Sequence, residues 1–133
     1  GKAFLNVDFS GKDLNGADFE NCKFYHCTFD NASLVNCNLQ NALFSNCSLY
    51  NVTAEEAELQ NARFFSCNLA KAFFTHSNFK EAVLKSCQTT SSSFMNCCIE
   101  NIALEETDLP NDEMFDSESD WIKNDIPDFE PNM

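Results

Sequence analysis

The residues with the most conspicuous chemistry in this chain are its eight cysteines. In the stretch ENCKFYHCTFDNASLVNCNLQNALF, residues 20–44, cysteines stand five and then ten residues apart, among asparagines and phenylalanines. So many cysteines in 133 residues usually indicate disulfides or a metal such as zinc. Which chemistry applies depends on where the backbone places the thiols, and therefore on the elements around them.

A repeat of five residues organises the chain. Every fifth residue from Phe4 to Leu109, here called the centre of a repeat, is large and apolar with two exceptions, Ala54 and Thr89. Neither the helical period of 3.6 residues nor the strand period of two produces this pattern. The residue two before the centre is small or apolar, apart from Lys12, and asparagine dominates two after it. Asparagine suits turns, so each repeat is predicted to be a short extended side with two inward side chains, followed by a corner.

This pattern resembles the pentapeptide-repeat family, whose consensus is A(D/N)LXX, and the segments GADFENCKF and NASLVNCNL are good instances of it. The resemblance covers residues 2–111. It implies an all-β fold, a right-handed quadrilateral parallel β-helix with four repeats in each 20-residue coil, and about five and a half coils in this chain. We therefore expect two parts, the β-helix over residues 1–111 and an acidic capping segment and tail over residues 112–133.

The five-residue register places the cysteines. Only Cys98 is expected to face outward, and the other seven occupy the small inward position: Cys22, Cys27, Cys37, Cys47, Cys67, Cys87 and Cys97. A free cysteine behaves there as a small hydrophobe that alanine, serine or valine can replace. Disulfides, zinc, and storage of a ligand or metal by stacked cysteines remain the alternatives. Free thiols in this number favour a reducing cytosol, so we expect a cytoplasmic protein.

No motif of a catalytic site accompanies the repeat. The chain contains no glycine-rich phosphate loop, HExxH or GxSxG, and a filled square rod offers flat walls rather than a cleft. His26 and His76 are expected at opposite corners, where they cannot share a metal. We therefore expect a non-enzymatic protein without cofactor or metal.

The net charge of −13 is divided unevenly along the chain. Residues 1–99 hold nine acids and seven bases, whereas residues 100–133 hold twelve acids and only Lys123. Direct binding of nucleic acid needs a basic footprint and is not expected, and no apolar run is long enough to span a membrane. Some pentapeptide-repeat proteins bind DNA gyrase as acidic mimics of the duplex. The resemblance implies this alternative function, but it requires negative walls, and residues 1–99 are nearly neutral.

One wall of the predicted rod differs from the others. The wall centred on Phe4, Phe24 and every twentieth residue after them is expected to present an aromatic and basic strip: Lys23, Tyr25, Leu43, Arg63, Phe65, Val83 and Lys85. Contiguous apolar patches often mark binding sites, although single exposed apolar residues are common. We predict a protein–protein interaction scaffold or module that binds another protein, of unknown identity, through this strip.

The five-residue pattern stops at Pro110. Acids then accompany four large apolar residues, Met114, Phe115, Trp121 and Ile122. Because the last coil of a repeat array needs a cap, we expect residues 112–123 to fold back as a short helical lid and the acidic residues after them to be flexible. Two chains could instead meet end to end through this coil, so a monomer and an end-to-end dimer are both open.

Overall fold

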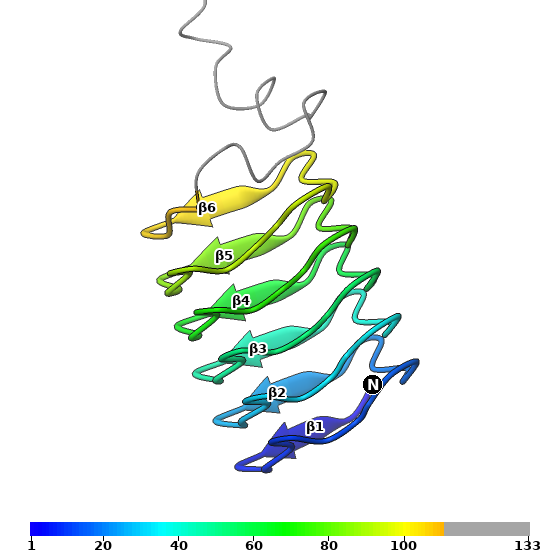
Figure 1. Cartoon of the computed structure of the whole chain (residues 1–133). Helices are drawn as coiled ribbons and strands as arrows, with labels where there is room; N and C mark the ends of the chain where they lie inside the picture. The colour runs from blue at the N-terminus through cyan, green and yellow to red at the C-terminus, as the bar shows by residue number, and fades with distance from the viewer. Residues whose placement is uncertain (111–133) are drawn as a thin grey trace, which may run out of the picture.

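The chain winds as a parallel β-solenoid of about five turns in the computed structural model, which describes residues 1–110 (Figure 1). The six strands form one parallel sheet in chain order: β1 (Ala3–Leu5), β2 (Lys23–Tyr25), β3 (Leu43–Ser45), β4 (Arg63–Phe65), β5 (Val83–Lys85) and β6 (Ala103–Glu105). Each strand pairs with the next at a shift of 20 residues, so that Phe24 lies beside Phe44. The predicted all-β fold and the 20-residue coil are confirmed, and the described residues contain no helix.

Only one of the four walls is a continuous sheet. We call the wall formed by β1–β6 wall A, and the walls that follow it along the chain walls B, C and D. Isolated parallel bridges join the coils on these three walls, as between Thr28 and Ser48 on wall B or between Asn78 and Cys98 on wall D. The sequence repeat treats the four walls alike, and it did not predict this difference.

A residue in the left-handed region turns the chain at every corner. The residue two after each centre, from Asn6 to Glu106, has a φ between 48° and 77°. Asparagine and glycine tolerate this conformation best and together occupy 12 of the 21 corners, although Glu56 and Lys71 adopt it as well. Because one such residue recurs every five positions, four corners close a coil and the next coil lies in register on the one before.

Stacked apolar side chains fill the interior. The rings of Phe4, Phe24, Phe44 and Phe64 stack along wall A, with centroids 5.1, 4.9 and 4.7 Å apart in that order. Phe24 also meets Phe29 of wall B edge-on at 5.1 Å. Aromatic pairs in such geometries add about 0.5–1.5 kcal/mol to the effect of burial alone. The centre residues from Phe24 to Leu84 are all buried, so the core is continuous over the middle coils.

The core is less covered in the last described coil. Leu104 of β6 is 37% exposed, and Leu109 is half-buried. The predicted helical lid with Met114, Phe115, Trp121 and Ile122 lies outside the described residues, as do the predicted boundary at residue 112 and the acidic tail.

The stacked core predicts a large difference between two phenylalanines. Phe44→Ala removes a fully buried ring and should lower the free energy of unfolding by about 3–5 kcal/mol. Phe73→Ala, the matched control on wall C, removes a side chain that is 47% exposed and should cost about 0.5 kcal/mol. Urea denaturation of the two variants measures both values, and similar losses would contradict the described packing.

Candidate functional site

The structure brings the seven predicted partner-binding residues together on the outer face of wall A. The strand register forms one row from Lys23, Leu43, Arg63 and Val83, and a second row from Tyr25, Ser45, Phe65 and Lys85. The three basic side chains are exposed, whereas the four apolar side chains are half-buried. Side chains on neighbouring parallel strands lie close enough to cover one another's flanks. The strip is therefore a flat face with apolar patches and protruding positive charges.

The bases of wall A are not neutralised within the rod. The one ion pair among residues 1–110 joins the Lys80 ammonium to the Glu100 carboxylate on wall D, 3.9 Å apart. It involves no residue of wall A. The strand register does place Glu105 beside Lys85, but the Lys85 ammonium and the Glu105 carboxylate do not form an ion pair. Lys23, Arg63 and Lys85 thus remain available to an acidic group from outside residues 1–110.

The other walls present fewer apolar groups, except for wall C, whose exposed apolar residues were not predicted from the sequence. On wall C, Phe73 is 47% exposed and Met95 is 45% exposed. Leu5 of β1, at 63%, extends the apolar part of wall A by one strand. Phe73, Met95 and Leu5 directly flank a centre residue, so the same register would have identified them.

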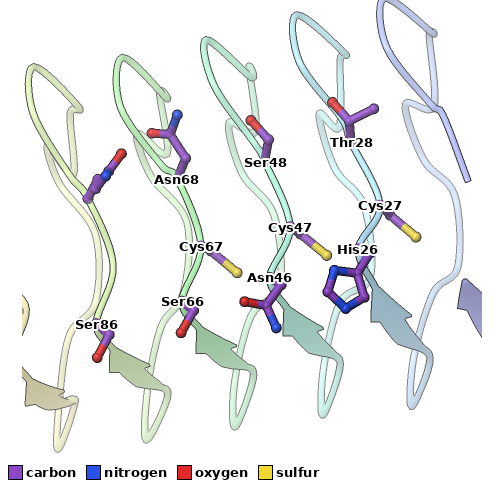
Figure 2. A pocket seen from close by; sticks show the side chains of 11 residues that line it. His26, Cys27, Thr28, Asn46, Cys47, Ser48, Ser66, Cys67, Asn68 and Ser86 are labelled. Carbon is purple, nitrogen blue, oxygen red and sulfur yellow. The ribbon is translucent and has the colours of Figure 1, made fainter. Parts of the chain in front are cut away.

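An open groove of about 460 Å³ runs along the corner between walls A and B (Figure 2). It is lined by the corner residues His26, Asn46, Ser66 and Ser86, by the row Thr28, Ser48, Asn68 and Gln88, and by Cys27, Cys47 and Cys67. Figure 2 shows the three cysteine side chains pointing in the same direction from successive coils. The lining carries no carboxylate and no lysine or arginine. The groove therefore offers hydroxyl, amide and thiol groups but no acid–base pair beyond a single histidine.

The cysteines lie as the sequence predicted. All eight are free thiols; seven are buried, and Cys98 is the more accessible one. Along wall B, each thiol donates a hydrogen bond to the carbonyl oxygen of the centre residue 23 positions earlier. These bonds run from Cys47 to Phe24, from Cys67 to Phe44 and from Cys87 to Phe64, each at 3.3 Å.

These thiols take the place of a turn hydrogen bond. At most corners the N–H three residues after the centre donates to the centre carbonyl, as from Ala32 to Phe29 at 2.9 Å. At the corner between walls A and B no such bond occurs within residues 1–110. There the Cys67 thiol donates a hydrogen bond to the Phe44 carbonyl and accepts one from the backbone N–H of Cys47. The position requires a small side chain that forms hydrogen bonds, so the expected interchange with alanine is incomplete.

Ser77 bridges another corner in the same way. The turn from Ala54 to Ala57, between walls C and D, also lacks its backbone hydrogen bond. The Ser77 hydroxyl donates to the Ala54 carbonyl at 2.6 Å and accepts the Ala57 N–H at 3.0 Å. We call a corner without the backbone turn hydrogen bond an open corner. At these open corners, a thiol or hydroxyl of the next coil lies over the turn.

The environment of the thiols governs their ionisation. Burial raises the pKa of Cys37, and it raises the pKa of Cys97 to about 12. Hydrogen-bonding contacts with the thiols of Cys47 and Cys87, together with burial, raise the pKa of Cys67; the same contact with Cys67 lowers the pKa of Cys47 and of Cys87. The thiolate is the nucleophile and the metal ligand, and the raised pKa values of Cys37, Cys67 and Cys97 disfavour this form.

The rod shows no metal centre. Within residues 1–110 no group of three or more histidine, cysteine, aspartate or glutamate side chains is arranged to hold a metal ion. His26 and His76 occupy the corner between walls A and B and the corner between walls C and D, which are diagonally opposite, as the sequence predicted. The described part of the chain also contains no helix of the length and apolarity needed to cross a membrane.

The family follows from a match between the sequence and a model of the pentapeptide repeat region, over residues 3–74 and 39–114. These ranges cover most of the chain, which therefore belongs to the pentapeptide-repeat family. Proteins of this family are generally non-enzymatic structural or binding modules. A comparison with curated protein sequences finds no significant match.

Three solved structures illustrate what the chain is similar to. A pentapeptide repeat protein from the cyanobacterium Cyanothece 51142 is 21% identical, over 82% of this chain and 85% of that one, with a TM-score of 0.48. A thylakoid-lumen protein of Arabidopsis thaliana is 22% identical over 82% and 71%, with a TM-score of 0.37. QnrB1, a plasmid-mediated fluoroquinolone resistance protein, is 19% identical over 85% and 84%, with a TM-score of 0.36.

The open corners predict unequal effects of two cysteine replacements. Cys67→Ala leaves the Cys47 N–H without its partner, while strand pairing with β4 still serves the Phe44 carbonyl, and should lower the free energy of unfolding by about 1–3 kcal/mol. Cys22→Ala is the matched control, because no described residue lies 23 positions before Cys22 to receive its thiol, and the backbone bond from its own N–H to Phe19, at 3.0 Å, does not involve its side chain. Urea denaturation should show the larger loss for Cys67→Ala and partial recovery for Cys67→Ser. Equal losses for the two alanine variants would exclude the bridging role.

The raised pKa of Cys97 predicts a loss of stability in alkali. A thiol of the unfolded chain ionises near pH 8.5, whereas Cys97 in the folded protein stays protonated up to about pH 12. Its contribution to stability is thus complete below about pH 8.5 and declines by up to about 1.4 kcal/mol per pH unit above it. Cys97→Ser keeps a donor for the Phe74 carbonyl without this ionisation. Its free energy of unfolding should therefore fall less steeply between pH 9 and pH 11 than that of the unaltered protein, and equal slopes would refute the assignment.

Proposed function

We propose that this chain is a non-enzymatic protein-interaction module whose binding face is wall A. The observation that carries the proposal is the set of three exposed bases, without an ion pair within residues 1–110, among half-buried aromatic and aliphatic side chains on one continuous sheet. Tyrosine and arginine are among the residues that contribute most to binding at protein interfaces. Tyr25, Arg63 and Phe65 stand near the middle of this face.

The geometry of wall A favours recognition by side chains. Its strands are bonded to neighbours on both sides from β2 to β5, so their backbone groups are not available to add a further strand. A partner must therefore contact the outward rows. The guanidinium of Arg63 suits a carboxylate, which it can bind through two parallel hydrogen bonds, and the flanking aliphatic residues suit an apolar side chain.

The non-enzymatic part of the proposal is supported by the surface that the rod offers. A catalytic site needs a nucleophile, a base or a metal converging in a concave pocket. The groove between walls A and B is open and lined by no carboxylate, lysine or arginine, and its contacts raise the pKa of the Cys67 thiol. Neither wall A nor this groove supplies a converging set of catalytic groups.

Mimicry of DNA, the alternative that the family resemblance suggests, is less favoured by the rod. A mimic needs a regular series of negative charges, since duplex DNA carries one per about 1.7 Å. The two outward rows of wall D interrupt their acids with neutral or basic residues: Asp18, Asn38, Glu58, Asn78 and Cys98 in one, and Glu20, Gln40, Gln60, Lys80 and Glu100 in the other. We therefore propose a protein partner at the basic wall A rather than mimicry through an acidic wall.

The proposal predicts that wall A variants lose partner binding without losing the fold. Tyr25→Ser, Arg63→Glu and Phe65→Ser together should abolish capture of the partner in a quantitative affinity purification. Arg63→Glu should cost about 0.5 kcal/mol of stability or less, and each replacement of a half-buried aromatic side chain should cost about 1 kcal/mol.

The matched control lies on and beside wall C. Lys71→Glu, Phe73→Ser and Met95→Ser alter the same kinds of residue at exposed positions and should leave capture unchanged. Loss of capture in the control, or its survival in the wall A variant with an unchanged melting temperature, would assign binding to another surface.

A further inference from the structure

The basic face of wall A has an acidic counterpart in the same chain. Residues 112–133 contain eight acids and a single base, Lys123. Apolar side chains are interspersed among these acids: Met114, Phe115, Trp121, Ile122, Ile126 and Phe129. Wall A offers the complementary mixture of bases and half-buried apolar side chains. We propose that the segment 112–133 of this chain is the ligand of wall A and docks on it in the intact protein.

The charges of the rod favour wall A over the C-terminal end as the docking place. The last described coil exposes Glu105, Glu106 and Asp108, and no base stands between Lys85 and Lys123. An acidic segment laid over that end would bring like charges together, which is unfavourable, whereas on β2–β5 it meets opposite charges. The prediction of a helical lid rests on the apolar residues of the segment and does not take the charges of Glu105, Glu106 and Asp108 into account.

Three of the four remaining bases among residues 1–110, all but Lys2, are less suited to this role. Lys80 is paired with Glu100 at 3.9 Å, and the Lys71 ammonium lies 5.7 Å from the centre of the Tyr50 ring. Lys12 stands near Asp8, whose pKa is lowered first by hydrogen bonds with Ser10 and then by this lysine. These three lysines each have an acidic or aromatic group nearby, whereas the bases of wall A take part in no ion pair among the described residues.

The segment is long enough to reach wall A. Neighbouring strands lie about 4.8 Å apart, so β5 and β2 are separated by about 14 Å. An extended chain covers about 3.3 Å per residue, and roughly ten residues would therefore reach from the last coil along most of the face. Covalent attachment also gives the segment an effective concentration in the millimolar range, which favours docking within one chain over docking between two.

This inference rests on the proposed function in taking wall A as the binding face, and it adds the chemistry of the ligand. That chemistry is an extended acidic segment with apolar anchors. Any other partner of wall A must then compete with the chain's own segment, so the rod would bind such a partner more weakly when the segment is present.

The single tryptophan of the chain, Trp121, reports docking directly in the full-length protein. Lys23→Glu, Arg63→Glu and Lys85→Glu together should shift its fluorescence emission to longer wavelength and increase quenching by acrylamide. The control Lys12→Glu, Lys71→Glu and Lys80→Glu makes the same change of charge on other walls and should leave both quantities unchanged. Raising the salt concentration of the unaltered protein should reproduce the effect of the wall A variant, since salt screens exposed charges.

Carbodiimide coupling of the unaltered protein supplies a second measurement that needs no variant. Mass mapping should find bonds from the amines of Lys23 and Lys85 to carboxylates of residues 112–133. In a mixture of ¹⁴N and ¹⁵N chains these bonds should join residues of the same chain. Bonds between labelled and unlabelled chains would show docking by a second copy and overturn the proposal.

The proposal is also overturned if Trp121 responds neither to the wall A variant nor to salt, because the segment then lies elsewhere. This failure is distinct from failure of the proposed function. Loss of partner capture in the Tyr25, Arg63 and Phe65 variant, with an unresponsive Trp121, would keep wall A as the binding face and remove only the segment as its ligand.

Discussion

The left-handed backbone conformation at every fifth residue is the constraint on which the rest of this structure depends. It turns the chain at each corner, and four such turns return it to the starting wall after 20 residues. A side chain therefore meets its counterpart of the next coil directly, and the stacked rings of Phe24, Phe44 and Phe64 result from this register. The conformation is unfavourable for most residues, and asparagine or glycine at more than half of the corners reduces that cost.

The hydrogen bonds at the corners explain why the cysteines are not a uniform set. A buried N–H without a partner is costly, and the corner between walls A and B leaves one without a backbone partner in successive coils. A thiol from the next coil satisfies this N–H, as Cys67 does for Cys47, whereas Cys22 has no such task because no described residue lies 23 positions before it. The ladder of Cys27, Cys47, Cys67 and Cys87 is therefore a structural element, and its high thiol content need not indicate redox or metal chemistry.

The sequence was sufficient to predict most of the fold, because its period directly encodes the geometry of a coil. The buried centres, the left-handed corners and the outward position of Cys98 all follow from that period. The period cannot distinguish one wall from another, so it did not predict that only wall A forms a continuous sheet. It also could not predict the open corners, because the five-residue period is the same at corners with and without the turn hydrogen bond.

The candidate site was predictable in part. The register assigns Lys23, Arg63 and Lys85 to one wall from their numbers alone. It does not give the half-burial of Tyr25 and Phe65 or the absence of ion pairs along the wall, because both depend on how long side chains of successive coils arrange themselves. The charge of residues 112–133 was visible in the sequence, but its complement on wall A emerged only with the exposure of the three bases.

The 20-residue coil also determines how this protein can change in length. Loss or gain of a single repeat would preserve every buried centre and every corner, so the fold would survive. All residues beyond the change, however, would rotate to the neighbouring wall, and a surface row such as that of Arg63 would be cut into two. Only insertions or deletions of a whole coil would keep the walls intact. An ancestral chain that grew by single repeats could thus acquire new surfaces without altering its core, whereas a chain with an established binding wall can lengthen only in steps of 20 residues.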